Sequence, residues 1–275
     1  MFKQRFATAS VLAFLFISAL LFLSTSVFIS FIMLIVLVAG WEWSDLARVK
    51  TVVGKVLFVL ALLLSILVIA AYVGIYTHLE QSLSYQICFA TTALWAVIFL
   101  WLQGYPSSAI LWSSQPIMLA LGIVLLTVTW LALASIISLE NGRYLVLLAM
   151  AIIILADIGG YIAGNLLGRH KLAPTISPGK TWEGLLGGLA LQVLLVMSLL
   201  TYISEINWLN LCLLVFPVAL SSVIGDLFES MLKRHRGIKD SSNLLPGHGG
   251  FLDRLDGVMA ALPLFFVILS KASPF

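Results

Sequence analysis

The sequence contains very little charge. Asp, Glu, Lys and Arg make up only 10% of its 275 residues, whereas hydrophobic residues make up 61%. A soluble globular domain is typically about 25% charged. With a mean hydropathy of +1.12, the chain has too much apolar surface for one water-soluble core, so its main solvent must be lipid. We therefore exclude an ordinary soluble enzyme, and we predict a lipid bilayer and no nucleic acid among its partners.

Cysteine is also scarce. Cys88 and Cys212 both lie in apolar runs, which favours small buried hydrophobic side chains. The sequence has no Cys/His spacing typical of a zinc site. It also lacks a cleavage pattern after its first apolar run. Lys3 and Arg5 are therefore interpreted as flanking an uncleaved first membrane span.

What the sequence does have is a series of long apolar runs. A helix needs roughly 20 mainly apolar residues to cross a bilayer, and fewer where flanking side chains reach the interface. The runs predict an all-α integral membrane protein with about nine transmembrane helices. Five spans form a predicted scaffold, residues 1–143, and four form a predicted catalytic region, residues 144–275. The predicted spans are Phe6–Leu23, Val27–Trp43, Val53–Thr77, Gln86–Leu102, Pro116–Ile136, Tyr144–Ile162, Leu185–Tyr202, Leu209–Ile224 and Leu255–Leu269.

The basic residues predict how these spans are oriented. With a cytoplasmic N-terminus, nine spans place every Lys and Arg on the cytoplasmic side except Arg143 and Lys271. Cytoplasmic loops are normally enriched in Lys and Arg, so we expect a multi-pass protein of the inner (cytoplasmic) membrane with its C-terminus outside. The segments 164–184 and 225–254 are then the two cytoplasmic loops, and they are predicted to form the active site facing the cytoplasm.

The second loop concentrates polar residues that suit a phosphate ligand. Asp253 and Asp256 are three residues apart and therefore share a helix face, and Asp226 and Glu229 repeat this spacing. Carboxylates suit Mg²⁺, and basic side chains beside flexible glycines suit phosphate oxygens. Carboxylates at a membrane edge are costly and usually functional, which favours a polyphosphate site over a loop that only binds lipid headgroups. The cations are Lys233, Arg234, Arg236 and Lys239, and the glycines are Gly237, Gly247, Gly249 and Gly250.

The segment Ser230–Asp256 resembles the signature of the phosphatidate cytidylyltransferase family. It contains, in the family's order and spacing, a serine, Lys-Arg, Lys-Asp, Leu-Pro, His-Gly-Gly, Asp-Arg and a final Asp. The segments Ser177–Gly184 and Asp157–Tyr161 are similar to two further elements of the family. Asn165 departs from the pattern, because many relatives have a basic residue there. By motif, the resemblance covers roughly the C-terminal half of the chain.

This resemblance implies transfer of the cytidylyl group of CTP to phosphatidate, with CDP-diacylglycerol and pyrophosphate as products. It also implies Mg²⁺ as cofactor, K⁺ as a candidate second cation, and a homodimer, for which Gly187, Gly188 and Ala190 would permit close helix contacts. The implied catalytic residues are Asp226, Lys239, Asp240, Asp253 and Asp256, and Asp226, Asp253 and Asp256 are the implied metal ligands. The implied substrate-binding residues are Ser177, Lys180, Thr181, Lys233, Arg234, His248 and Arg254.

Three other functions compete with this one. The segment Asp253–Gly257 matches the start of the CDP-alcohol phosphotransferase motif, but apolar residues follow where that motif continues. A CTP-dependent lipid kinase remains an alternative, as does an ion-coupled transporter that uses Asp157 within the sixth span. A transporter would place charges deep in both halves of the chain. Asp157 is interpreted equally as a cavity residue or a structural partner, and Glu42 and Asp45 as interfacial.

Overall fold

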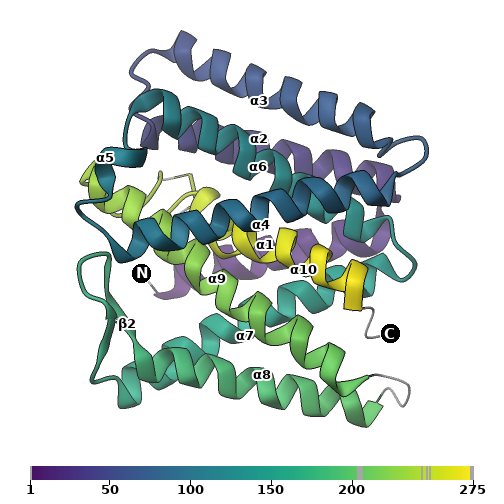
Figure 1. The fold of residues 1–275 in the computed structure, drawn as a ribbon, viewed down its shortest axis with the longest axis vertical. Coiled ribbons are helices and arrows are strands. Elements are labelled where there is room, and N and C mark those ends of the chain that lie inside the picture. Colours follow the sequence, from purple (N-terminus) through teal and green to yellow (C-terminus); the bar gives the residue numbers. More distant parts are fainter. Residues whose placement is uncertain (1, 203–206, 243, 246, 248, 273–275) are drawn as a thin grey trace.

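The computed structural model describes residues 2–202, 207–242, 244–245, 247 and 249–272. Across these residues, nine helices of at least 21 residues run back and forth through the molecule (Figure 1). A short helix, α5 (Ala109–Trp112), and an antiparallel hairpin of β1 (Lys171–Ala173) and β2 (Ser177–Thr181) complete the fold. The long helices are α1 (Phe2–Phe22), α2 (Thr25–Leu46), α3 (Val52–Val73), α4 (Gln81–Gln103), α6 (Gln115–Ile137), α7 (Gly142–Leu167), α8 (Trp182–Tyr202), α9 (Trp208–Arg236) and α10 (Leu252–Ala272).

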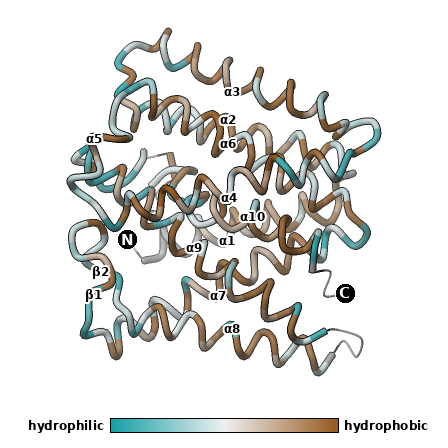
Figure 2. Tube along the Cα trace, in the orientation of Figure 1, coloured by the Kyte–Doolittle hydropathy of each residue, from teal (hydrophilic) through white to brown (hydrophobic). Residues whose placement is uncertain are grey.

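Most of these helices consist largely of hydrophobic residues along their length (Figure 2), and many of their hydrophobic side chains are exposed. Large side chains such as Leu64, Leu100 and Ile110 are more than 60% exposed, which suits a lipid environment. By length and composition, seven helices among the described residues can cross a membrane: α2, α3, α4, α6, α7, α8 and α9. The prediction of an all-α membrane protein is therefore confirmed. Because α1 and α10 are not among the seven, nine crossings stay a prediction.

Helix α9, which corresponds to the eighth predicted span, is longer than predicted. Its span was predicted to end at Ile224 because charged residues begin there, yet the helix continues to Arg236. The extension keeps one apolar face, on which Phe228, Met231 and Leu232 are buried. Gly237 then ends the helix with φ +76°, a left-handed conformation that favours glycine. Much of the predicted loop 225–254 is thus helical, and it holds several predicted site residues on a rigid element.

Helices α7 and α8 cross through glycines. A Cβ added at Gly159 would lie 2.5 Å from the backbone oxygen of Gly187, and one added at Gly188 would lie 2.8 Å from that of Ala156. Only glycine permits two backbones to approach this closely. Gly187 and Gly188 therefore pack inside one chain, and they give no support to the homodimer, which stays a prediction. The crossing also fixes α7 beside the β hairpin.

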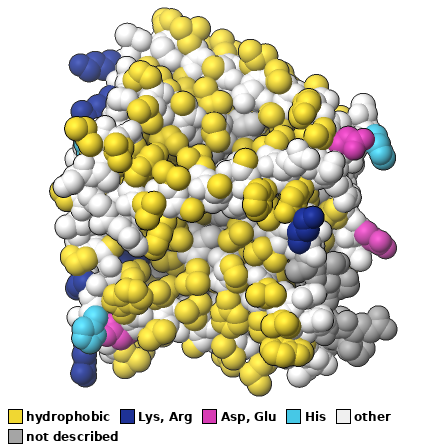
Figure 3. All heavy atoms as spheres, viewed as in Figure 1, with side chains coloured by type: hydrophobic (Ala, Val, Ile, Leu, Met, Phe, Trp, Pro, Cys, Tyr) yellow, Lys and Arg dark blue, Asp and Glu magenta, His cyan; other side chains and the backbone are white. Residues whose placement is uncertain are grey.

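The alternating directions of the helices gather four segments at one end of the bundle. These segments are the end of α2, the β hairpin, the end of α9 and the start of α10 (Figure 1). Most of the Lys and Arg side chains visible in Figure 3 lie along this same edge of the molecule. The start of α1 lies toward this end and the end of α10 toward the other. This arrangement brings the predicted cytoplasmic loops together.

Candidate active site

A cavity of about 490 Å³ lies between α7, α9 and α10 at the basic end of the bundle. We refer to it as the acidic cavity, because more carboxylates than cations line it. Four predicted catalytic residues and two predicted substrate-binding residues meet there, together with Asp157. The charged residues that line it are Asp157, Asp226, Asp240, Asp253, Asp256, Lys233 and Arg254.

A second cavity, of about 430 Å³, lies between α7, α8, α9 and the β hairpin. In this hairpin cavity most of the lining atoms are apolar, and its polar residues include Ser177, Lys180 and Thr181, all predicted to bind substrate. Asp157 and Asp226 line both cavities. The two cavities therefore adjoin at a pair of carboxylates, one from α7 and one from α9.

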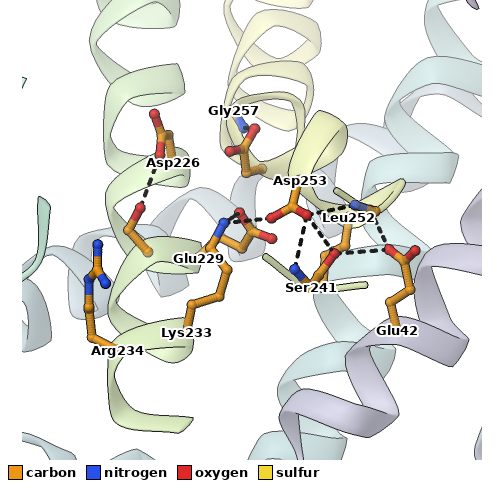
Figure 4. Close-up of polar contacts among 12 residues, drawn as sticks. Glu42, Asp226, Glu229, Lys233, Arg234, Ser241, Leu252, Asp253 and Gly257 are labelled. Carbon is orange, nitrogen blue, oxygen red and sulfur yellow. Dashed lines mark hydrogen bonds and ion pairs between the residues drawn. The ribbon is translucent and has the colours of Figure 1, made fainter. Parts of the chain in front are cut away.

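Asp226 connects the β hairpin to α9. Lys180 of β2 forms an ion pair with it, with 2.6 Å between Nζ and Oδ2. Ser230, one turn further along α9, donates a hydrogen bond from Oγ to Oδ1 at 3.2 Å (Figure 4). Both charged side chains are partly exposed, at 23% for Lys180 and 30% for Asp226. Both side chains line the hairpin cavity and are therefore accessible from it.

Lys233 lies between two carboxylates. Its Nζ is 2.7 Å from Oε2 of Glu229 and 2.6 Å from Oδ1 of Asp253 (Figure 4). Glu229 is fully buried, and its Oε1 has no hydrogen-bond partner among the described residues. A buried carboxylate requires a paired cation, because desolvation of an unpaired charge is costly. Lys233 therefore has a structural task here, while its predicted role in substrate binding stays a prediction.

Asp253 is held by the loop that precedes α10. Its Oδ2 accepts hydrogen bonds from the backbone N–H groups of Ser241 (2.9 Å) and Gly250 (2.7 Å), and from Ser241 Oγ (2.9 Å). With Lys233 on Oδ1, both of its oxygens are engaged. Asp256 differs, because its one recorded hydrogen bond within the described chain comes from the backbone N–H of Gly257. Asp256 is thus the freer carboxylate of the two.

Other predicted site residues lie apart from the acidic cavity. Arg234 is exposed, and its Nε donates to the backbone oxygen of Ile176 at 3.1 Å, which ties α9 to the hairpin. Lys239 is exposed and lines neither cavity. Thr181 is buried, and its Oγ1 accepts the N–H of Gly184 at 3.1 Å, as a helix N-cap does. His248, predicted to bind substrate, lies outside the described residues.

Sequence reasoning missed two buried carboxylates that contact predicted site residues or the loop that holds them. Glu42, interpreted as interfacial, is fully buried and accepts hydrogen bonds from the loop before α10, so that interpretation is wrong. The available signal was a carboxylate at the end of an apolar run, the same signal that identified Asp226. Glu229 was noted for its spacing from Asp226 but was given no role. Its burial cannot be read from the sequence alone.

The carboxylates of the acidic cavity fit the predicted Mg²⁺ in part. Among the residues described, no three Asp, Glu, His or Cys side chains converge as a metal-binding group. Mg²⁺ usually takes only one or two carboxylates and completes its coordination with water and substrate phosphates. Asp226 and Asp256 line one cavity. They fit a Mg²⁺ ion that arrives with a polyphosphate, whereas the engaged oxygens of Asp253 fit less well.

The chain is similar to known proteins over nearly its whole length. The profile of a family described as "Cytidylyltransferase family" matches residues 3–271. Phosphatidate cytidylyltransferase of Pseudomonas aeruginosa is 37% identical over 274 residues, which cover 99% of this chain and 98% of the relative. The protein of the same name from Haemophilus influenzae is 34% identical over 286 residues, 96% of this chain and 97% of the relative. One from Staphylococcus saprophyticus is 47% identical over 134 residues, 47% of this chain and 50% of the relative. The similarity thus extends well beyond the C-terminal motifs.

Proposed function

The chain belongs to the cytidylyltransferase family, and we propose that it transfers the cytidylyl group of CTP to phosphatidate, giving CDP-diacylglycerol and pyrophosphate. The observation that carries this function is the 37% identity to a phosphatidate cytidylyltransferase over nearly the whole of both chains. The site agrees with it, because carboxylates and cations meet beside a largely apolar cavity. Such a site suits one nucleotide substrate and one lipid substrate.

The reaction joins two anions. A phosphate oxygen of phosphatidate, already ionised near neutral pH, attacks the α-phosphorus of CTP. The bond from that phosphorus to the oxygen bridging the β-phosphate breaks, and pyrophosphate leaves with the electron pair. No strong general base is needed. The protein must instead align the two phosphates and stabilise the negative charge that develops on pyrophosphate.

The two adjoining cavities support a division between the substrates. The acidic cavity suits the triphosphate of CTP, with Lys233 and Arg254 as its cations. The hairpin cavity suits phosphatidate, because its lining is mainly apolar and Lys180 supplies a cation for the lipid phosphate. Tyr161, which lines this cavity, is 73% exposed on a surface that would face lipid. The reacting phosphates would then meet beside Asp226, where the cavities adjoin.

Asp226 and Asp256 are the proposed ligands of a Mg²⁺ ion bound with CTP. When bound, Mg²⁺ would supply positive charge to the phosphate oxygens and to the leaving pyrophosphate. Asp253 stays a predicted ligand, and K⁺ stays a candidate second cation. Asp240 also lines the acidic cavity. Lys180, released from Asp226 by an incoming phosphate, would orient the attacking lipid phosphate.

Incubation of the purified full chain in detergent with cytidine-labelled CTP, phosphatidate and Mg²⁺ tests this function. We expect a lipid-soluble cytidine product and pyrophosphate in equal amounts, both dependent on phosphatidate. Diacylglycerol in place of phosphatidate should give neither product. Release of CDP together with a newly phosphorylated lipid would instead support the kinase alternative and contradict the proposal.

The proposed orientation places the active site on the cytoplasmic face of the inner membrane, with the N-terminus inside and the C-terminus outside. Single cysteines at Lys171 and His78, which are both exposed, test it in a chain with Cys88 and Cys212 replaced. In intact cells, we expect an impermeant maleimide to label His78→Cys but to label Lys171→Cys only after permeabilisation. The positive-inside rule predicts this pattern. Labelling of Lys171→Cys in intact cells would contradict the orientation.

A further inference from the structure

We infer that Glu42, at the end of α2, is a positioning residue for this reaction: its buried carboxylate fixes the loop and the start of α10 that hold Asp253 and Lys233. The inference rests on the proposed function for its kinetic consequences, and on the structure alone for its contacts. It assigns a role in the active site to the N-terminal half of the chain, which was predicted to act only as a scaffold.

Both carboxylate oxygens of Glu42 contact the loop and the start of α10. Its Oε1 accepts hydrogen bonds from Ser242 Oγ at 2.6 Å and from the N–H of Phe251 at 3.1 Å. Its Oε2 accepts from the N–H of Leu252 at 2.7 Å and lies 3.2 Å from Ser241 Oγ. The side chain has no exposed surface. A buried carboxylate with two contacts on each oxygen, all from one loop about 200 residues away in sequence, sets the position of that loop.

The contacts of Glu42 continue without interruption into the acidic cavity. Ser241 lies against both Glu42 and Asp253, with its Oγ 2.9 Å from Asp253 Oδ2 (Figure 4). Asp253 in turn pairs with Lys233, and both residues line the cavity. The Leu252 N–H that Glu42 accepts is at the start of α10, where a negative charge also interacts favourably with the helix dipole. Glu42 thus determines where α10 begins and, through it, where its carboxylates lie.

The end of α2 is itself firmly anchored. Trp43 is fully buried, and its Nε1 donates to the backbone oxygen of Met118 at 2.7 Å. The same indole occupies the space that a Cβ on Gly122 would need, so α2 and α6 are closely packed there. A side chain that projects from a packed helix end positions its partners more accurately than one on a loop. Glu42 therefore fixes the loop and the start of α10 relative to the packed helices α2 and α6.

Gly250 gives an independent indication that the loop is shaped to fit closely against the Glu42 carboxylate. A Cβ added there would lie 2.5 Å from both oxygens of Glu42, and closer still to Ser241 Oγ. Any larger residue would push the Glu42 carboxylate away from the loop. Ser241 Oγ and the Glu42 carboxylate together therefore leave room only for glycine at this position. Gly250→Ala should therefore disturb the same contact as a change at Glu42 itself.

The decisive experiment compares Glu42→Gln with the wild type as full-length monodisperse protein in detergent. Gln conserves shape but offers one acceptor oxygen where four contacts converge. We expect kcat with CTP and phosphatidate to fall at least tenfold, and KM for CTP to change less than threefold. We also expect the backbone amides of Phe251 and Leu252 to exchange hydrogen for deuterium at least tenfold faster. Asp45→Asn, one turn along the same helix, is the matched control and should resemble the wild type in both measurements.

The outcomes separate the inference from the proposed function. If the wild type forms no CDP-diacylglycerol, the function fails, and amide exchange still tests the contact. If Glu42→Gln exchanges faster but keeps its kcat within twofold, Glu42 only stabilises the fold and the inference is wrong. Should Glu42→Gln not fold, Gly250→Ala replaces it with the same expected split between kcat and KM. Unchanged exchange in a folded variant would also overturn the inference.

Discussion

Asp256→Asn and Asp226→Asn are each expected to lower kcat by about 100-fold or more and to leave the amount of folded protein nearly unchanged. Both side chains line the acidic cavity and are the proposed Mg²⁺ ligands. Asn keeps the shape of Asp but removes the charge of a hard oxygen ligand, and loss of one electrostatic group acting on transition-state charge typically costs 10²–10³ in rate. Stability should change little, because a partly exposed ion pair such as Lys180–Asp226 contributes about 1 kcal/mol or less.

Specific activity and Mg²⁺ dependence of the two variants, measured in detergent, check this prediction. Asp253→Asn is expected to behave differently, because Asp253 also holds Ser241, Gly250 and Lys233. It should lose thermal stability together with activity. Near-wild-type turnover with unchanged Mg²⁺ dependence in both Asp226→Asn and Asp256→Asn would remove the metal assignment. It would leave membership of the family unaffected, since that rests on similarity over the whole chain.

The parts of the site that the sequence could predict are those concentrated in short polar segments. Ser230–Asp256 and Ser177–Gly184 stand out against an apolar background because every charge near lipid carries a cost. The structure does bring Lys180, Asp226 and Asp256 to adjoining cavities. Polar spacing along the chain and the family resemblance therefore selected residues that the packed helices bring together, without any knowledge of that packing. The apolar runs gave the all-α fold for the same reason, because their lengths match the thickness of a bilayer.

The parts that the sequence could not predict depend on which helices become neighbours. Glu42 and Ser241 are 199 positions apart, and their contact follows from the packing of α2 beside α9 and α10. The α7–α8 crossing likewise used glycines that could equally have served an interface between two chains. In both cases the type of residue indicated a special role, but the sequence did not indicate which residue it would contact. Partner choice is a property of tertiary packing and is only weakly encoded in local sequence.

Lys233 gives the second large effect, and one that the sequence alone would misjudge. Lys233→Ala is expected to destabilise the protein by about 3–5 kcal/mol, the usual result of removing one partner from a buried ion pair. Glu229 is fully buried, and Lys233 is its one recorded partner within the described chain. Without the ammonium group, a carboxylate remains uncompensated in the interior. We therefore expect a lower thermal midpoint, less monodisperse protein and little activity.

A rescue experiment separates this structural task from the predicted binding of CTP phosphates. Lys233→Met combined with Glu229→Gln replaces the buried pair with neutral side chains of similar size, and such replacements are often neutral or stabilising. The double variant should regain part of the thermal midpoint lost in Lys233→Ala, because Glu229 no longer leaves an uncompensated charge, whereas Asp253 still lacks its cation. Its kcat should stay low, since the acidic cavity would keep Arg254 but lose the Lys233 ammonium group, and Asp253 would lose its partner on Oδ1. Arg236→Ala is the control for loss of a cation that leaves no buried carboxylate unpaired. Arg236 is exposed, and its Nε donates to the backbone oxygen of Asp45. If Lys233→Ala instead keeps the wild-type midpoint and only raises KM for CTP, Lys233 is a substrate ligand and the structural task assigned to it is wrong.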